Sequence, residues 1–372
     1  MAVNSTTFSG KQFEVYIGAE DTIGTFDATS NWSGNYQIDV EGITLPTFNP
    51  AQEFEMRTGS GRIAEFAQVF SSTKRVVTEF TLTGRLNLMT WTIFMENIMA
   101  DTFDGGTGSD SVMTTPNDYA PANFKHGDSH AENTDFEETL SVYFQAPTAA
   151  DSYKLSGCVC TSFSIDADMD SNAGRFNYSA TFQTGYQPAK GAQSVSSAAS
   201  IGSDYMYLST LGYKNIDIKD YDGSTDQDGI DPIFKTFNMS IESPSQFLGA
   251  QGANANPQVF ARAVPELDIK WGGAVKYDAE TDNLLEAHRD TGSASYLTFY
   301  MSDVDKAGGT YAAPTGNRFG ASSSQKFGLW FGKSKLTSCE GTSEDLAMVN
   351  FEAKVLAPSS GDTAYFLAQD NA

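Results

Sequence analysis

Histidine, which often serves in acid–base catalysis and metal binding, is scarce in this sequence. Only 3 of the 372 residues are His, and two of them, His126 and His130, lie four residues apart with Asp128 between them. On a helix that spacing could hold a metal ion, but Gly127 and the polar residues nearby are typical of a loop. We therefore interpret the segment as a solvated loop and predict no metal site there.

The cysteines and glycine-rich motifs do not point to catalysis either. Cys158 and Cys160 fall on a predicted strand and are interpreted as ordinary strand residues, and an odd total of three cysteines argues against a disulfide framework. The sequence has no Gly-x-Ser-x-Gly motif, no P-loop and no Gly-x-Gly-x-x-Gly motif. We predict a protein that is not an enzyme and needs no cofactor.

Two acidic segments resemble calcium-binding loops in part. In 166–174 acids occupy the first, third and fifth positions, but Ser171 stands where the loop needs Gly and Asn177 where it needs Glu. That segment is interpreted as a solvated hairpin tip. The run Asp220–Asp231 is similarly incomplete, and calcium binding there stays an open alternative. Among 47 acids no pair is singled out for glycoside hydrolysis.

The composition excludes several classes of protein. The chain has 23 Lys and Arg against 47 Asp and Glu, a formal charge of −24, which argues against a protein that grips nucleic acid by its phosphates. Hydrophobic residues make up 40 % and aromatic residues 12 %, enough for packed cores. No apolar run approaches the roughly 18 residues of a membrane span. From the first residues we expect no secretory signal.

The residue pattern predicts a mainly β fold. Short alternating runs separated by Gly, Asn, Asp, Ser and Pro are typical of antiparallel sheets, and the best strand candidates are Phe13–Ile17, Thr78–Gly84, Ser141–Gln145 and Arg175–Phe182. One segment has helical spacing instead, with Asn87 as its N-cap. It predicts a packed helix with the apolar residues Leu88, Trp91, Met95, Ile98 and Met99. Loop composition is found in 46–74, 101–135 and 188–203.

The second half of the chain repeats the plan of the first half. Pro265–Trp271 matches Thr78–Gly84, with Glu266 opposite Glu79, at an offset of 187 (266 − 79), and Val349–Val355 matches Phe176–Phe182 at an offset of 173 (349 − 176). Further matches are Leu329–Ser338 with Tyr153–Phe163, Tyr296–Tyr300 with Ser141–Gln145, and a weak helical piece at Ala279–His288 with the helix at 88–99. The alternative is that any two β domains share such alternation.

This plan predicts two tandem β domains and a connection between them. We predict domain 1 at 1–190, a linker or insertion at 191–232 and domain 2 at 233–372. The stretch Asp204–Pro232 finds no counterpart in the first half, and it is interpreted either as an insertion on the outer surface or as the start of the second domain.

The order of elements in the first half resembles a known family. Ile38–Pro46, a long mixed loop, Val77–Gly84, the helix at 88–99, Leu155–Asp166 and Phe176–Phe182 follow one another as in the tail tube (major tail) proteins of long-tailed bacteriophages. The resemblance covers about residues 8–187. It implies a β-barrel or β-sandwich domain with one flanking helix and long loops, six of which form a ring. A chain with two such domains would form the ring as a trimer with pseudo-six-fold symmetry.

The resemblance also implies partners and a location. Rings stack into a tube in the virion tail, made in the host cytoplasm, through which genomic DNA passes without specific binding along an acidic lumen. Partners are further copies of the chain, the tape measure protein, the tail terminator and the distal tail or baseplate, with no membrane anchor. The segment 46–74 resembles an arm that docks on a neighbouring subunit or ring, or else folds back as a hairpin. Its candidate docking residues are Phe54, Met56, Arg57, Arg62, Phe66, Phe70, Lys74 and Arg75.

Two other classes remain open from the sequence. A β-sandwich adhesin or other virion decoration protein would share this composition, bind host-surface glycans and use the Asp220–Asp231 run for calcium. An all-β carbohydrate-active enzyme would need a cleft with a pair of acids, one of them with a perturbed pKa.

Overall fold

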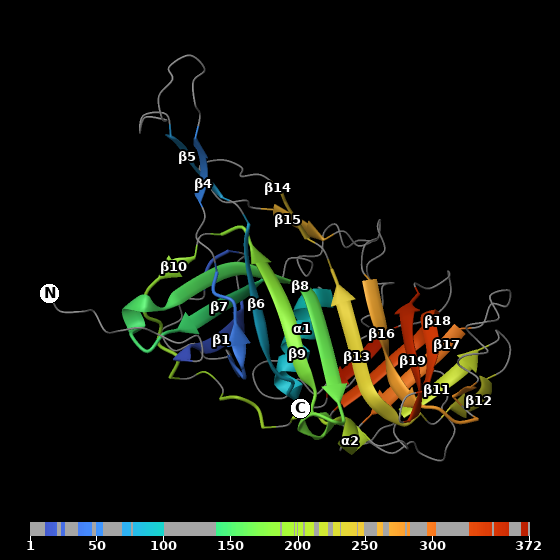
Figure 1. The fold of residues 1–372 in the computed structure, drawn as a ribbon. Helices are drawn as coiled ribbons and strands as arrows, with labels where there is room; N and C mark the ends of the chain where they lie inside the picture. The colour runs from blue at the N-terminus through green and yellow to red at the C-terminus, as the bar shows by residue number, and fades with distance from the viewer. Residues whose placement is uncertain are drawn as a thin grey trace.

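The fold was examined in a computed structural model. It describes residues 12–20, 24–26, 36–46, 50–54, 69–75, 77–99, 139–186, 188–196, 198, 200–203, 205–211, 216–221, 226–230, 232–243, 245–248, 259–262, 268–279, 281–282, 296–302, 327–343, 346–356 and 366–370. The prediction of a mainly β fold is confirmed, because most of the described elements are strands of one large antiparallel sheet (Figure 1).

The first half of the chain contributes ten strands. They are β1 (Glu14–Ala19), β2 (Tyr36–Ile38), β3 (Gly42–Ile43), β4 (Pro50–Phe54), β5 (Val69–Arg75), β6 (Thr78–Arg85), β7 (Leu140–Gln145), β8 (Tyr153–Asp168), β9 (Asn177–Thr184) and β10 (Ala189–Lys190). Helix α1 (Leu88–Met99) lies between β6 and β7, and short 3-10 turns occupy Ala149–Asp151 and Asn172–Gly174. In the sheet the strand order is β2-β1-β7-β8-β9-β6-β3, and β10 pairs with β8.

The second half contributes ten further strands. They are β11 (Ile216–Tyr221), β12 (Asp226–Ile230), β13 (Phe234–Glu242), β14 (Ser245–Leu248), β15 (Val259–Arg262), β16 (Asp268–Lys276), β17 (Tyr296–Ser302), β18 (Phe327–Ser343), β19 (Ala347–Val355) and β20 (Phe366–Asp370). A short helix, α2 (Leu208–Leu211), precedes them. Their order in the sheet is β12-β11-β17-β18-β19-β16-β13, and β20 pairs with β18.

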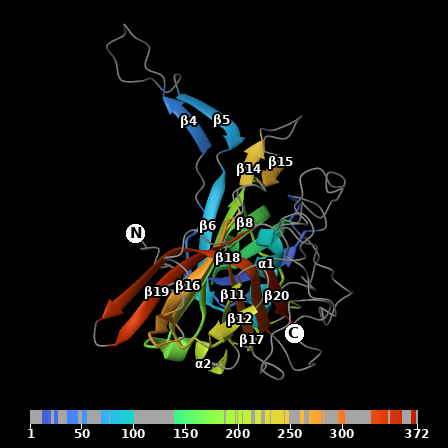
Figure 2. The ribbon, with the colours of Figure 1, turned by 90° about the vertical axis from the view of Figure 1, so that its right-hand side faces the viewer.

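These two strand orders are the same when the strands are taken in chain order. In each half the third strand along the chain lies at one end of the set and is followed by a separate two-stranded sheet, β4–β5 in the first half and β14–β15 in the second. Figures 1 and 2 show both small sheets beyond the same end of the large sheet.

The long strands β8 and β18 show the correspondence residue by residue. The pairing of β7 with β8 shifts register between Leu140 and Val142 of β7. The pairing of β8 with β9 shifts register between Cys160 and Ser162 of β8. The corresponding shifts of β18 fall between Leu297 and Phe299 of its partner β17, and between Leu336 and Ser338 of β18 in its pairing with β19. The second shift therefore recurs at an offset of 176 (336 − 160). β-Bulges are specific features of a strand, so a matching pair fixes the equivalence of the two strands.

Register then fixes the other equivalences. Cys160 pairs with Phe182 and Leu336 with Ala353, so β9 matches β19 at an offset of 171 (353 − 182). Phe80 pairs with Phe182 and Trp271 with Ala353, so β6 matches β16 at 191 (271 − 80). The offsets of 173 and 187 expected from the sequence are therefore wrong by two and four residues.

One side of the sheet packs against α1 and carries the core of the first half. Figures 1 and 2 place the helix on a single side of β6, β8 and β9. Asn87 caps the helix, as predicted, by accepting a hydrogen bond from the Thr90 N–H at 2.8 Å. The Phe94 ring meets Phe163, Tyr178 and Phe182 edge-on, with centroids 5.2 to 5.7 Å apart. The alternating inward residues of β6, β8 and β9 thus fold around this helix.

The core of the second half is centred on Phe299. Its ring lies 4.4 Å from Trp271 and 5.4 Å from Phe331, centroid to centroid, and stacks on Phe237 at 5.6 Å. The Trp271 indole N–H donates to Ser334 Oγ at 2.9 Å within this buried region. These aromatic residues supply the apolar area that holds the second half together.

Strands lie within two of the segments predicted as loop or linker. The segment 46–74 contains strand β4 and most of β5, which pair with each other as a hairpin. The predicted linker 191–232 contains α2, β11 and β12, and β11 pairs with β17 in the place that β1 takes beside β7. Asp204–Pro232 therefore has a counterpart in the first half. Of the predicted helical piece Ala279–His288 only 279 and 281–282 are described, and 101–135 lies outside the described residues.

Candidate functional site

The residues predicted to dock on neighbouring subunits are only partly covered by the structure. Phe54 ends β4, and Phe70, Lys74 and Arg75 lie on β5. The other four, Met56, Arg57, Arg62 and Phe66, lie outside the described residues. The structure thus places the two sides of the predicted arm on one hairpin.

The residues predicted for the packed helix lie on α1. Leu88, Trp91, Met95 and Ile98 are buried in the core, with exposed fractions of 5 % or less. Met99 is the last residue of the helix. The helix also supplies a polar contact to the sheet, because the Asn97 side-chain oxygen accepts a hydrogen bond from the Cys160 N–H at 2.6 Å. This contact lies at the bulge of β8, where the regular ladder is interrupted.

The two halves of the chain are joined along the edges of β8 and β13. These strands pair antiparallel from Ser162 opposite Glu242 to Asp168 opposite Thr236. On the core side Met239 lies opposite Ile165, and each is 1 % exposed. On the other side Ser162 Oγ donates to Glu242 Oε1 at 2.8 Å. We call this paired region the β8–β13 joint.

Within the described part of the chain, the strands equivalent to β8 and β13 end the sheet with edges that have no partner strand. Strand β18 is equivalent to β8, and its segment Ser338–Ser343 pairs with β19 on one edge only, as far as the described residues show. Strand β3 is equivalent to β13, and β6 is its one partner strand in the described part of the chain. An edge strand presents unpaired N–H and C=O groups that can bind another strand.

The side chains at these two edges are more exposed than their equivalents in the joint. Ile43 pairs with Leu82 and Phe237 with Gly273, so β3 matches β13 at an offset of 194 (237 − 43). Leu45 then matches Met239, yet Leu45 is 36 % exposed and Met239 is 1 % exposed. Gly341 on β18 matches Ile165 and is likewise exposed. The contrast follows from the strand that covers one pair of edges and not the other.

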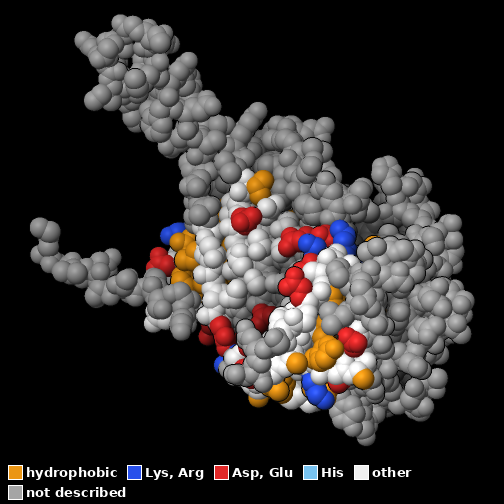
Figure 3. Space-filling view, turned by 45° about the vertical axis from the view of Figure 1, so that its right-hand side comes forward, with side chains coloured by type: hydrophobic (Ala, Val, Ile, Leu, Met, Phe, Trp, Pro, Cys, Tyr) orange, Lys and Arg blue, Asp and Glu red, His pale blue; other side chains and the backbone are white. Residues whose placement is uncertain are grey.

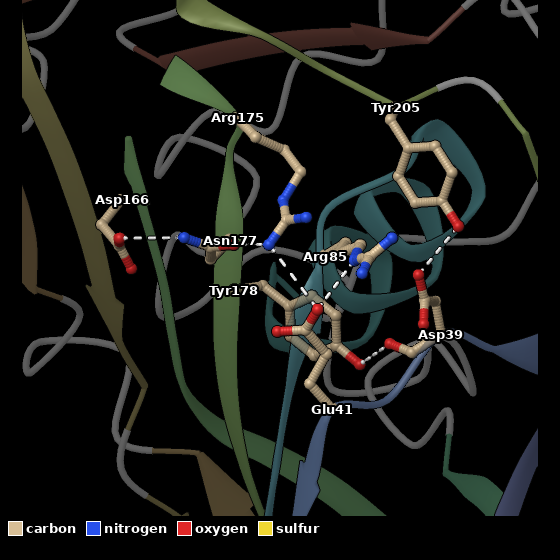
Figure 4. A network of polar contacts seen from close by, with 8 residues as sticks. All are labelled: Asp39, Glu41, Arg85, Asp166, Arg175, Asn177, Tyr178 and Tyr205. Carbon is tan, nitrogen blue, oxygen red and sulfur yellow. Dashed lines mark hydrogen bonds and ion pairs between the residues drawn. The ribbon is translucent and has the colours of Figure 1, made fainter. Parts of the chain in front are cut away.

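A polar network holds the β3 segment in place (Figure 4). Just before β3, Glu41 Oε1 accepts from Arg85 Nε at 2.7 Å and lies 3.6 Å from the Arg175 guanidinium. Asp39 is held from two sides: the Tyr178 hydroxyl donates to its carbonyl oxygen at 2.7 Å, and the Tyr205 hydroxyl donates to its carboxylate at 2.8 Å. Burial, and then the negative charges of Asp39 and Glu41, raise the pKa of Tyr178, which stays a donor.

The same network reaches the β8–β13 joint. Arg175 donates to Asn177 Oδ1 at 3.2 Å, and Asn177 Nδ2 donates to Asp166 Oδ2 at 3.4 Å. Asp166 lies opposite Asn238 in the joint. With the Glu41–Arg175 ion pair, these hydrogen bonds form a continuous chain of polar contacts from the residue before β3 to the joint.

The face of the sheet opposite α1 is polar. Its alternating positions carry mainly hydroxyl and amide side chains, which are Thr81, Thr83, Ser162, Ser164, Asn177, Ser179, Thr181, Gln183, Asn238, Ser240 and Asn350. Charged side chains are interspersed on the same face, with acids at Glu79, Asp166, Asp168, Glu242, Asp268, Glu340 and Glu352 and bases at Arg85, Lys270, Lys276, Lys335 and Lys354. Figure 3 shows acidic and basic side chains, some of them side by side, among white surface. We call this surface the polar sheet face.

Ion pairs on this face are arranged around Asp268. Lys354 Nζ lies 2.8 Å and Lys270 Nζ 3.3 Å from its carboxylate oxygens. Burial alone would raise the pKa of Asp268, but the two ammonium groups outweigh it and lower that pKa. The acid is therefore ionised at neutral pH and its charge is partly compensated.

Among the described carboxyl groups, Glu20 is the one whose pKa is raised. Burial raises it, although its carboxylate accepts hydrogen bonds from Gly24 N and Gly157 N at 2.7 Å each, from Thr139 Oγ1 at 2.5 Å and from Ser141 Oγ at 3.0 Å. These donors bind both oxygens and connect the end of β1 with Ser141 on β7 and Gly157 on β8. These contacts give Glu20 a structural role, and a carboxyl group whose two oxygens both accept hydrogen bonds is poorly placed for acid catalysis.

The cysteines and acidic segments form no chemical centre in the described residues. None of the three cysteines forms a disulfide, and all are buried. Burial raises the pKa of the Cys339 thiol to about 11. No group of three or more His, Cys, Asp or Glu side chains converges as a metal site within the described part of the chain. His126 and His130 lie outside it, and Asp220–Asp231 covers the end of β11 and β12.

Comparisons with known proteins add no identification. No family model and no curated protein sequence matches this chain. No helix in the described ranges is long and apolar enough to cross a membrane. The function must therefore be inferred from the two unpaired edges, the joint and the polar sheet face.

Sequence reasoning missed the edges at Ile43–Pro46 and Ser338–Ser343. A signal was present in the sequence: the dipeptide Thr-Ser occurs at 161–162 and again at 337–338, an offset of 176, and it lies at the bulge in both long strands. With the long strands aligned there, the edge residues of β18 would have been matched to the joint residues of β8.

Proposed function

We propose that this protein is a tail tube protein of a long-tailed bacteriophage, which assembles into rings of three chains that stack into a tube for DNA ejection. One observation carries the proposal: two halves with the same strand order are joined edge to edge, and among the described residues no strand pairs with the equivalents of the two joined edges. A second chain can repeat the joint at these edges. Such a head-to-tail contact forms a closed ring when the rotation from one chain to the next returns to the first chain after a whole number of chains.

The repeat supports a ring with six quasi-equivalent domains. Each chain supplies one joint within itself and one between itself and its neighbour. Three chains then give six joints of one kind, which is the pseudo-six-fold arrangement that the resemblance implies. Domain 1 would run through β10, and domain 2 would begin before β11, because β11 and β12 hold the places of β1 and β2.

The two faces of the sheet support the assignment of an inside and an outside. In the proposed ring the polar sheet face lines the lumen and α1 lies outside. Short hydroxyl and amide groups give DNA phosphates few tight contacts, and specific grip on phosphates requires basic clusters. The acids outnumber the bases on this face, and the chain carries a formal charge of −24. This charge repels phosphates over roughly 8 Å at physiological salt.

The two small sheets support stacking of rings. Hairpins β4–β5 and β14–β15 lie beyond the same end of the large sheet (Figures 1 and 2). In a ring of three chains, six such hairpins would point along the axis toward the next ring. The predicted docking residues Phe54, Phe70, Lys74 and Arg75 lie on the first of them.

Electron microscopy of the purified protein, with native mass spectrometry of the same sample, tests the proposal. We expect hollow tubes or stacked rings with three chains in each ring. Rings of six chains would keep the tube function and contradict the tandem-domain argument. Discrete monomers or trimers that never stack at high concentration would contradict the tube and favour an adhesin or decoration protein.

A further inference from the structure

We propose that the contact between neighbouring chains is a β-ladder of fixed register, in which Ile43–Pro46 of one chain pairs antiparallel with Glu340–Ser343 of the next. This inference rests on the proposed ring and adds the partner surfaces and their alignment. It follows from the β8–β13 joint, whose register is known, and from the equivalence of its strands with β18 and β3.

The register follows from the two offsets without adjustment. Asn238 pairs with Asp166 in the joint. Subtracting 194 from 238 gives Thr44, and adding 176 to 166 gives Thr342. The same step applied to Met239 and Ile165 places Leu45 opposite Gly341. The neighbouring pairs are Ile43 with Ser343 and Pro46 with Glu340.

The side chains at the proposed contact are compatible with this alignment. Leu45 is 36 % exposed and would lie beside Gly341, whose missing side chain leaves room for it. The equivalent pair Met239 and Ile165 is buried in the joint. Thr44 and Thr342 would meet on the polar sheet face, as Asn238 and Asp166 do.

The chemistry of the two edges also limits the contact. The proposed ladder has four residue pairs, against seven in the β8–β13 joint. Pro46 limits pairing on the β6 side, because the Thr44 N–H donates to Thr81 O and the next backbone position facing β6, Pro46, has no N–H. Glu340 is exposed at the end of the segment. A short edge with a proline and a charge discourages indiscriminate pairing with other strands. The occupant that matches its register and its side chains is a second copy of this chain.

Disulfide trapping tests the register. Thr44→Cys and Thr342→Cys are combined in a Cys339→Ser background, and the assembled protein is treated with diamide, which oxidises two thiols to a disulfide and takes up both hydrogens. We expect a ladder of covalent dimers and closed trimers on a non-reducing gel, reversed by dithiothreitol. Cross-strand partners lie within the ~4.4–6.8 Å that a disulfide needs between Cα atoms.

Two matched controls define the result. Asn238→Cys with Asp166→Cys, at the equivalent pair of the joint, should form a disulfide within one chain and no ladder. Thr44→Cys with Glu340→Cys is displaced by two residues and should cross-link at least ~10-fold less, because its Cα atoms lie beyond disulfide reach. A ladder from the displaced pair that equals the aligned pair would overturn the register.

Hydrogen exchange on the unmodified chain covers the case in which the cysteine variants fail to assemble. Backbone pairing should slow exchange of the amides of Ile43, Leu45, Gly341 and Ser343 at least ~10-fold on assembly. The Thr44 N–H already donates to Thr81 O and should change little. Rings seen by microscopy without this protection, or without the aligned cross-link, would overturn the ladder and leave the tube function intact. Absence of rings in the unmodified protein would contradict the proposed function itself.

Discussion

A charge placed at Leu45 should block assembly while leaving the single chain folded. Leu45 is 36 % exposed, and in the proposed contact it takes the place of Met239, which is 1 % exposed. Fully burying a leucine side chain contributes about 1.5–3 kcal/mol, so burying the remaining third contributes roughly 0.5–1 kcal/mol to each contact. Leu45→Asp loses this contribution and also buries a carboxylate without a partner, which costs several kcal/mol.

The expected effect on assembly is large compared with the effect on folding. A loss of about 3 kcal/mol per contact corresponds to a rise of roughly 100-fold in the concentration at which rings form, since 1.4 kcal/mol is tenfold. In the isolated chain the new carboxylate stays in water at an exposed edge, where substitutions usually change stability by about 0.5 kcal/mol or less. Sedimentation across a concentration series measures assembly, and urea unfolding of the unassembled chain measures stability.

The chain offers a matched control for this experiment. Ile201 is also 36 % exposed and lies on neither edge, so Ile201→Asp should assemble as the unmodified protein does. Leu45→Met, which copies the residue found in the joint, should also assemble. The reasoning is refuted if Leu45→Asp forms rings at the same concentration as Ile201→Asp.

Three further predictions concern the stability of the chain. Glu20→Gln should lower the free energy of unfolding in urea by about 1–3 kcal/mol, because hydrogen-bond donors lose their acceptor. Burial raises the native pKa of Glu20, so its contribution to stability is greatest below its ordinary pKa of about 4.3 and falls as the pH rises through the raised value. A larger loss at pH 7 than at pH 4 would contradict this. Trp271→Phe should cost about 1–3 kcal/mol by leaving Ser334 Oγ without its 2.9 Å donor, and a double-mutant cycle with Ser334→Ala should show positive coupling; additive costs would argue against the bond. Phe94→Ala should lower the free energy of unfolding by about 3–5 kcal/mol, because three aromatic contacts are lost; a loss below 1 kcal/mol would contradict the assigned core.

Local patterns predicted the elements whose neighbours are close in sequence. The helix at 88–99 and its cap at Asn87 were readable because helix periodicity and capping depend on residues a few positions apart. The inward and outward residues of β6 and β9 were readable for a similar reason, since alternation has a period of two.

Register and long-range pairing were not readable from the same patterns. A shift by two residues moves a strand along its partner and leaves every side chain on its original face. The alternation of β19 therefore fits β9 equally well at an offset of 173 or 171, and pairing across the bulge at Thr337 decides for 171. Strands β11 and β12 were missed because acidic residues of the run Asp220–Asp231 suggested a loop or a calcium site.

A duplicated chain separates two demands that a single-domain tube protein must meet with one contact. The β8–β13 joint forms during folding and is sealed by the buried pair Met239 and Ile165. In the proposed ring, the equivalent contact between chains carries Leu45 and Gly341 and has four residue pairs, against seven in the joint. The joint can therefore be strongly apolar without risk of aggregation, because its two edges are tethered in one chain. The edges between chains must stay in water until assembly, so a smaller apolar area and a shorter ladder there keep the unassembled chain soluble, and ring closure supplies the missing stability by making every contact at once.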